Sequence, residues 1–315
     1  MNKMVSLNIR LPENFLNEEI RDDYVVSTQM KEVWAVELDL LNKVLEVCKK
    51  NNIEIMASGG TLLGAVRHRG FIPWDDDIDL MMMRDQYDKL CAVAEKEFTY
   101  PYFFQTEYTD PGSLRGHAQL RNSQTTGILK GEMGTCKFNQ GIFIDIFPLD
   151  HVVDDDFLFE KQKKKALFYN ECARKIASVT VNYNLSQNSG VKKYIKKIIN
   201  KTFGKVLEKG NFERYFYKKF ENAWKKYNNQ DTVMCSTLSF AEACKAHFKK
   251  CEYFMEMDEL PFEFMSIPVC YRYEELLTQR YGKWKRIEKG ASCHGEVFFD
   301  TNESYEKYIE GSKDR

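Results

Sequence analysis

Four acidic residues stand close together in the segment Trp74-Asp75-Asp76-Asp77-Ile78-Asp79-Leu80. Alternate side chains of a strand share a face, so Asp75, Asp77 and Asp79 are predicted to point together. Carboxylates packed this closely repel one another, and a divalent cation relieves that repulsion. Their oxygens suit Mg²⁺ or Mn²⁺, ions that bridge protein carboxylates to substrate phosphates. The segment therefore predicts metal-assisted chemistry at a phosphate, and the alternative is a solvated acidic turn.

A glycine pair lies shortly before these acids, in Ser58-Gly59-Gly60-Thr61. It follows a predicted strand and opens a predicted helix. Glycines let a ligand approach the backbone, and the N-terminus of a helix attracts anions. Gly59, Gly60 and Thr61 are therefore candidates for binding phosphate, and the alternative is an ordinary turn between a strand and a helix.

A further carboxylate, Asp145, interrupts the apolar segment Gly141-Ile-Phe-Ile-Asp-Ile-Phe-Pro148. Burying an unpaired carboxylate is costly, so Asp145 needs a partner. The same metal ion is one candidate partner, and an arginine of the core is the other.

The elements that must position these residues follow from hydrophobic periodicity. Apolar residues at helical spacing predict a helix over 31–50, and further helices are expected over 61–67 and 85–97. Strands are expected over 53–57, 78–83, 102–106, 117–121 and 141–147, and Pro148 is expected to end the last one. This order predicts an α+β fold in which helices flank a small mixed sheet, with residues 1–150 as the catalytic core.

The second half of the chain has a different character. Residues 161–226 contain 18 lysines and arginines but only four acidic residues. Residues 157–228 are predicted to be helical, with a polar break at 182–190, and a last helix over 272–281 is expected to stop at Gly282. We therefore expect residues 151–315 to form a mostly helical, Lys-rich C-terminal half from which segments return to the catalytic site.

The order of a strand, a glycine pair at a helix start and an Asp-x-Asp on the next strand resembles the nucleotidyltransferase fold. Residues 60–79, from Gly60-Thr-Leu-Leu-Gly to Trp74-Asp-Asp-Asp-Ile-Asp79, resemble the hallmark of LicD-type phosphocholine transferases, a family related to fukutin and fukutin-related protein. Residues 141–150 resemble its second block, and Ile267-Pro-Val, Tyr273-Glu-Glu-Leu-Leu, Tyr281-Gly282 and His294 resemble a weaker third one. Residues 161–226 match no block of the family.

The resemblance implies Asp75, Asp77, Asp79 and Asp145 as ligands of Mg²⁺ or Mn²⁺, with Asp77, Asp79 and Asp145 as the catalytic set. It also implies transfer of phosphocholine from CDP-choline to a glycan hydroxyl, with release of CMP. The glycan would be a teichoic acid, lipopolysaccharide or capsule precursor, carried on a lipid. Ribitol or glycerol phosphate from another CDP donor, and a non-catalytic basic module that binds glycan or nucleic acid, are the alternatives.

Other residues are candidates for contacting this substrate. Arg67, His68 and Arg121 are expected near its phosphates. A quaternary ammonium is held best by aromatic faces, for which Trp74, Tyr281 and Trp284 are the candidates, with core packing as the alternative. His294 is included with the substrate-binding residues.

Composition bounds the location and the partners. The 315 residues include 43% hydrophobic ones, yet no apolar run reaches the length of a membrane span, and the N-terminal sequence lacks a signal-peptide pattern. The nine cysteines are scattered, and the spacing of Cys235, Cys244, His247 and Cys251 fits no common zinc motif. We therefore expect a cytoplasmic protein with reduced thiols. As a separate expectation, nucleic acid is not among its partners.

The lysine-rich segment has two interpretations. Lys192, Lys193, Lys196 and Lys197 alternate with apolar residues, as in helices that lie on an anionic membrane. This pattern favours peripheral contact with the inner face of the membrane, and a solvated helix face is the alternative.

Overall fold

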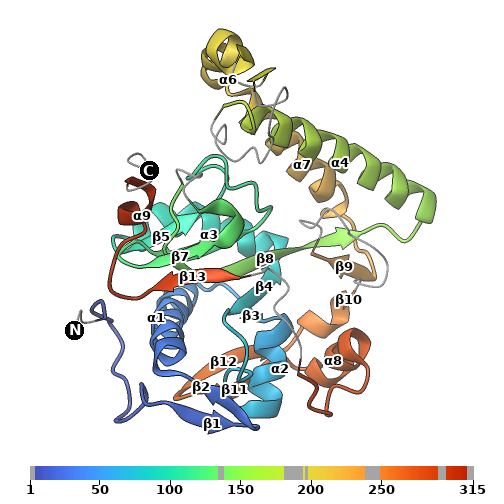
Figure 1. Cartoon of the computed structure of the whole chain (residues 1–315). Coiled ribbons are helices and arrows are strands. Elements are labelled where there is room, and N and C mark those ends of the chain that lie inside the picture. The colour runs from blue at the N-terminus through green and yellow to red at the C-terminus, as the bar shows by residue number, and fades with distance from the viewer. Residues whose placement is uncertain are drawn as a thin grey trace.

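The strand β8 (Ile142–Val152) is the centre of a mixed seven-stranded sheet, as the computed structural model of the chain shows (Figure 1). The structure describes residues 4–133, 138–180, 194–195, 198–237, 249–289 and 296–310. β8 pairs in parallel with β4 (Asp79–Met83) and antiparallel with β6 (Ala118–Asn122) and β9 (Met234–Ser236). β3 (Met56–Ala57), β5 (Tyr102–Gln105) and β10 (Lys249–Lys250) extend the sheet beyond β4, β6 and β9.

The prediction that Pro148 ends its strand is wrong. The N–H of Asp145 donates to Ile78 O, so alternate residues of β8 direct their nitrogens towards β4 and Pro148 directs its nitrogen the other way. On that other side, Pro148 falls between Ile146, which pairs with β6, and Asp150, which pairs with β9. Its missing N–H therefore costs no ladder bond, and β8 crosses residue 150 to end at Val152.

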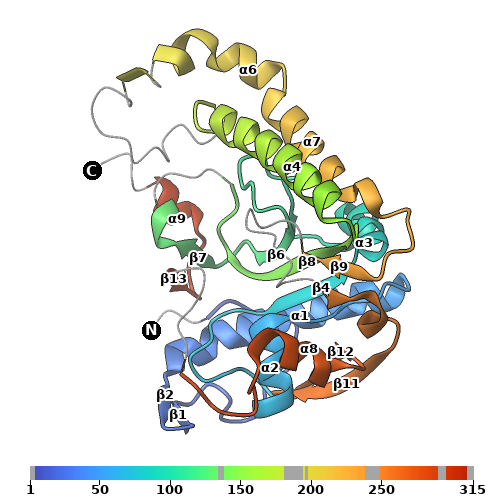
Figure 2. The same ribbon diagram turned by 90° about the vertical axis from the view of Figure 1, so that its right-hand side faces the viewer.

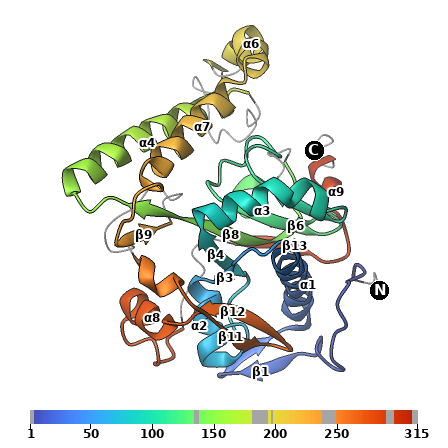
Figure 3. The same cartoon turned by 180° about the vertical axis from the view of Figure 1, so that it is seen from behind.

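Three helices pack on this sheet. α1 (Thr28–Lys50) is capped by Ser27, whose hydroxyl accepts the N–H of Met30 at 3.2 Å. This helix contacts β6 and β8. α2 (Gly59–His68) leads from β3 towards β4, and α3 (Arg84–Glu97) lies against β4 and β8, where Figure 3 shows it from behind. The predicted helices over 31–50, 61–67 and 85–97 are all present.

A helical arm projects from the sheet (Figures 1 and 2). We use this name for the described residues between 156 and 224. α4 (Asp156–Ala177) and α7 (Phe212–Trp224) pack side by side around a second apolar cluster that includes Phe159, Ala166 and Trp224. A π-helical turn (Asn200–Gly204) and α6 (Lys205–Lys209) lie at its far end. The helical prediction is confirmed for the described residues, whereas the predicted break at 182–190 lies outside them.

The C-terminal segments return to the first half of the chain. The hairpin of β11 (Met257–Phe262) and β12 (Met265–Cys270) joins the main core, and α8 (Tyr273–Tyr281) ends at Gly282, where φ is +61°. β13 (Val297–Asp300) pairs with β7 (Thr126–Leu129), and α9 (Glu306–Glu310) follows it. The remaining elements are the hairpin β1 (Glu19–Arg21) and β2 (Tyr24–Val26) and the 3₁₀ turns Lys130–Glu132, Lys225–Tyr227 and Cys251–Phe254.

The α+β class with a mixed sheet flanked by helices is confirmed. The described cysteines, which are Cys48, Cys91, Cys172, Cys235, Cys251 and Cys270, are free thiols. Within the described ranges, no helix combines the length and the apolar character that crossing a bilayer requires.

Candidate functional site

A cavity of about 820 Å³ opens where the sheet, α2, α4 and the segment that follows α8 meet. It is lined by nine of the residues predicted as site residues: Gly60, Arg67, Trp74, Asp75, Asp77, Asp79, Asp145, Tyr281 and Trp284. These nine residues are spread over more than two hundred positions of the sequence, and the fold brings them together.

The carboxylates form one wall of this cavity. Asp79 on β4 and Asp145 on β8 are direct neighbours in the parallel register. Asp75 and Asp77 line the same cavity from the loop before β4, because the strand begins only at Asp79, whereas Asp76 is not on the cavity wall. Asp75, Asp77 and Asp79 therefore share the cavity as predicted, although Asp75 and Asp77 precede the strand.

The two paired carboxylates differ in their surroundings. The pKa of Asp79 lies well above its usual range, because its carboxyl is desolvated and because the charges of Asp77 and Asp145 stand nearby. Desolvation would also raise the pKa of Asp145, but His117 and Gln119 outweigh it and lower that pKa. His117 Nε2 lies 3.1 Å from Asp145 Oδ1, and Gln119 Nε2 donates to the same oxygen at 2.6 Å. Asp145 is thus held as a carboxylate.

The glycine pair accommodates carboxylates of the protein itself. A Cβ at Gly59, where φ is +53°, would lie 2.8 Å from Asp79 Oδ2, and a Cβ at Gly60 would lie 2.5 Å from Asp75 Oδ2. Thr61 Oγ1 accepts the backbone N–H of Asp79 at 2.8 Å. Of the three, only Gly60 lines the cavity, so Gly59 and Thr61 position the acids.

A fifth carboxyl group, which the sequence reasoning missed, lies behind these acids. Glu37 on α1 is only 1% exposed, and its Oε2 has no hydrogen-bond partner among the described residues. Burial raises the pKa of Glu37 well above its usual range, and the charges of Asp77, Asp76 and Asp75 raise it further. The signal was present in the sequence, since Glu37 interrupts the apolar residues of its helix.

These donors fit a hard divalent cation. Glu37 Oε2, which has no hydrogen-bond partner among the described residues, and the crowded negative charges around Asp79 both indicate a position where a cation would be stabilised. No three Asp, Glu, His or Cys side chains of the described residues are arranged as a complete metal-binding group. Mg²⁺, however, is often held by one or two carboxylates, with substrate phosphates and water completing its shell. Asp79 and Asp145 could therefore hold an ion that arrives with a diphosphate.

Basic and aromatic side chains also line the cavity. Arg280, Tyr281, Lys283, Trp284, Arg286 and Lys289 reach the cavity from α8 and the segment that follows it. Arg67 ties α2 to that segment, because its Nη1 donates to the carbonyl oxygens of Trp284 and Arg286, each at 3.3 Å. Trp74 also lines the cavity and packs edge-on against Tyr24, with ring centroids 6.0 Å apart.

His68 and Arg121, which were predicted to contact phosphate, do not line the cavity, and neither do Gly59 and Thr61. His68 is turned to Asp22, whose Oδ2 lies 2.9 Å from His68 Nε2, and burial lowers the pKa of that histidine. Arg121 is 1% exposed and lies inside the sheet, because Gln105, Gln119 and the carbonyl of Gly141 occupy its guanidinium. His294 lies outside the described residues. Conversely, Arg115, His117, Gln119 and Arg280 line the cavity without having been predicted.

Known proteins are similar in sequence to this chain. Residues 52–170 match the nucleotidyltransferase domain of the LicD/FKTN/FKRP family. The lipopolysaccharide cholinephosphotransferase LicD of Haemophilus influenzae is 27% identical over 268 residues, which cover 82% of this chain and 92% of that protein. An uncharacterized protein of Rickettsia prowazekii is 41% identical over 70 residues, which cover 22% of this chain and 24% of that protein. An uncharacterized protein of Rickettsia typhi is 42% identical over 67 residues, which cover 21% of this chain and 22% of that protein.

Proposed function

This chain belongs to the LicD/FKTN/FKRP family, and on that premise we propose that it is a phosphotransferase that moves phosphocholine from CDP-choline to a hydroxyl of a cell-surface glycan. CMP would be the other product. Because the Haemophilus influenzae relative is a lipopolysaccharide cholinephosphotransferase, lipopolysaccharide is the first acceptor to test, ahead of teichoic acid and capsule precursors. The observation that carries the proposal is that paired carboxylates and basic and aromatic side chains line the same cavity.

The carboxylate wall would bind the phosphate end of the donor. Asp79 and Asp145, helped by Asp75 and Asp77, would hold Mg²⁺ or Mn²⁺. When bound, this ion would neutralise negative charge on the diphosphate. Arg280 and Arg286, which line the same cavity, would donate to phosphate oxygens. The lowered pKa of Asp145 favours a role as a ligand over a role as the base that takes the hydroxyl proton.

The aromatic side chains would hold the choline end. Trp74, Tyr281 and Trp284 line the cavity, and aromatic rings are the groups that attract a quaternary ammonium. Trp284 is kept in place by its Nε1, which donates to Thr278 Oγ1 at 3.1 Å. A donor with an uncharged alcohol would gain nothing from these rings, so they favour choline over ribitol or glycerol.

The test is CMP release from CDP-choline, CDP-ribitol and CDP-glycerol with a lipopolysaccharide acceptor and Mg²⁺. We expect CDP-choline to be the best donor, chelation of the metal to stop the reaction, and Asp79→Asn to abolish turnover. Asp85→Asn, at the exposed start of α3, is the matched control and should keep wild-type activity. Release of phosphocholine in place of CMP from CDP-choline would indicate transfer of the nucleotide, and the absence of any donor-dependent thermal shift would indicate a binding module.

We also propose that the helical arm contacts an anionic membrane, where a lipid-linked acceptor would lie. Phe203 and Val206 are each 62% exposed at the far end of the arm, beside Lys201 and Lys205. Exposed apolar side chains among lysines are typical of helices that bind an anionic bilayer. Lys192, Lys193, Lys196 and Lys197 lie outside the described residues.

Vesicle sedimentation tests this contact. We expect binding to vesicles that contain phosphatidylglycerol, weaker binding to phosphatidylcholine alone, and loss of binding in Phe203→Ser/Val206→Ser. The control is Phe157→Ser, in the first turn of α4, which removes a 75% exposed side chain. Equal sedimentation of all three proteins would rule out this surface.

A further inference from the structure

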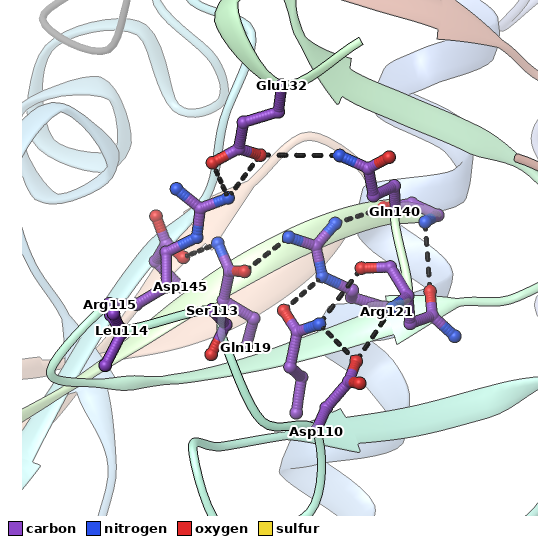
Figure 4. A network of polar contacts seen from close by, with 12 residues as sticks. Asp110, Ser113, Leu114, Arg115, Gln119, Arg121, Glu132, Gln140 and Asp145 are labelled. Atoms are coloured by element: carbon purple, nitrogen blue, oxygen red, sulfur yellow. Dashed lines mark hydrogen bonds and ion pairs between the residues drawn. The ribbon is translucent and has the colours of Figure 1, made fainter. Parts of the chain in front are cut away.

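Arg121 is a buried cation whose hydrogen bonds end on neutral oxygens. Its side chain donates from Nε to Gln105 Oε1 at 2.6 Å, from Nη1 to Gly141 O at 2.7 Å, and from Nη2 to Gln119 Oε1 (Figure 4). Burial lowers its pKa to about 9. Keeping a guanidinium inside a sheet without a directly paired carboxylate is costly, so the position calls for a reason.

The strand register supplies that reason. Gln105 on β5 pairs with Gln119 on β6, Gln119 pairs with Asp145 on β8, and Asp145 pairs with Asp79 on β4. Directly paired residues share a face of a sheet, so these four polar side chains form one row across four strands. Arg121 lies two residues from Gln119 on the same strand and therefore on the same face. The row connects the buried cation with the carboxylate wall of the cavity.

Gln119 has two possible orientations, and Arg121 selects one of them. An amide group has a carbonyl end that accepts and an NH₂ end that donates, whereas a guanidinium only donates. Arg121 therefore holds Gln119 Oε1, and the NH₂ end must face Asp145, to which it donates at 2.6 Å. The opposite orientation would place two donors against each other and an amide oxygen against a carboxylate.

We propose that Arg121 is a positioning residue that acts through Gln119 to fix the carboxylate of Asp145. Gln119 and His117 hold Oδ1, which leaves the other oxygen of that carboxylate for the ligand in the cavity. The inference rests on the proposed transferase function for its kinetic effect, but its structural part does not. It also replaces the predicted phosphate contact of Arg121 with an indirect role.

A merely structural role for Arg121 would give different results from this one. Gln119→Glu separates the two, because a carboxylate at this position would still pair with Arg121 but would offer no amide donor to Asp145. We expect this variant to remain folded, because Arg121 offsets the new charge, and to lose kcat for CMP release by about 10- to 100-fold, the range typical of groups that orient metal ligands. The KM for CDP-choline should stay within about threefold of wild type, because the basic and aromatic residues that line the cavity are unchanged.

The coupling between the two residues is measured by a double-mutant cycle. Arg121→Lys keeps the charge but lacks the fork that reaches three acceptors at once, so it should lower kcat about tenfold. In the Gln119→Leu background the same change should lower kcat no further. Arg84→Lys, a change in another buried arginine away from the cavity, is the matched control, which should lose stability and keep kcat.

Crystal structures of Gln119→Glu and Arg121→Lys decide the inference independently of the substrate. The expected result is a rotated Asp145 carboxylate in both variants. Wild-type positions for Asp145 in both would overturn the inference even if CDP-choline proves to be the donor. Additive losses of kcat in the cycle, or full kcat in Gln119→Glu, would overturn it as well. A displaced Asp145 in a protein that turns over no CDP donor would uphold the positioning and reject the proposed function alone.

Discussion

Replacing Gly60 with alanine tests whether Asp75 must lie where the structure places it. The added Cβ would stand 2.5 Å from Asp75 Oδ2, whereas ordinary contact begins at 3.4 Å. The carboxylate would therefore have to move by about 0.9 Å. A displacement of about 1 Å in a catalytic constellation can cost on the order of 100-fold in rate, so we expect Gly60→Ala to lose about that much kcat/KM for CMP release.

The stability of this variant should change little. The group that yields is the end of a side chain, and alanine is favoured over glycine in a helix by up to about 1 kcal/mol. We therefore expect the free energy of unfolding in urea to stay within about 1 kcal/mol of wild type. Gly60→Ala would then lose activity while it keeps its stability. A general packing defect would instead lower both.

Two other glycines serve as comparisons. A Cβ at Gly64 would meet the carbonyl oxygen of Gly70 at 2.4 Å, and this backbone atom cannot move freely, so Gly64→Ala should lose about 1–3 kcal/mol of stability. At Gly131 a Cβ would meet nothing within 4 Å, so Gly131→Ala should resemble wild type in both assays. Activity of Gly60→Ala within threefold of wild type, or a loss that merely follows its stability, would refute the reasoning about Asp75.

Three further predictions follow from other parts of the molecule. Arg84 donates to both oxygens of buried Asp150, at 2.8 and 2.7 Å, so Arg84→Met should cost about 3–5 kcal/mol in urea unfolding, and a loss under 1 kcal/mol would contradict this. Burial and the neighbouring Glu107 raise the pKa of Glu213 from an ordinary 4.5 to about 9. Between these pH values the folded state binds more protons than the unfolded state, so the stability of the wild type should fall as pH rises. In thermal unfolding, Glu213→Gln should therefore be more stable than wild type at pH 9 but not at pH 4. A difference in stability that does not change with pH would contradict the raised pKa of Glu213. Tyr281→Leu should raise the KM for CDP-choline about 3- to 30-fold with little change in kcat, and an equal rise for CDP-glycerol would show that no cation is recognised.

Much of the site could be predicted because its signals are local. The acids at 75, 77 and 79 are close in the chain, and Asp145 stands out because its neighbours are apolar. Helices such as α1 and α3 follow from spacing alone, and Gly282 ends α8 because glycine readily adopts a positive φ. These features depend on only a few neighbouring residues.

The partners of these acids could not be predicted in the same way. Gln119 meets Asp145 only through the register of β6 and β8, and Glu37 reaches the cluster only because α1 packs behind it. The sequence places Arg121 near the end of a predicted strand, but the neighbouring β5 and Gly141 decide that its guanidinium is enclosed. The sequence predicts that the glycine pair makes room for a ligand. Only the folded structure shows that the carboxylates of Asp79 and Asp75 fill the space beside these glycines.

The sequence by itself determined which residues carry charge suited to phosphate chemistry, and which segments form helices and strands, since residue type and spacing act over a few positions. Tertiary structure decided which of those residues share a cavity, which are paired, and which are enclosed. The physical reason is that the energy of a charge depends on every group within several ångströms, and strands far apart in the chain supply those groups.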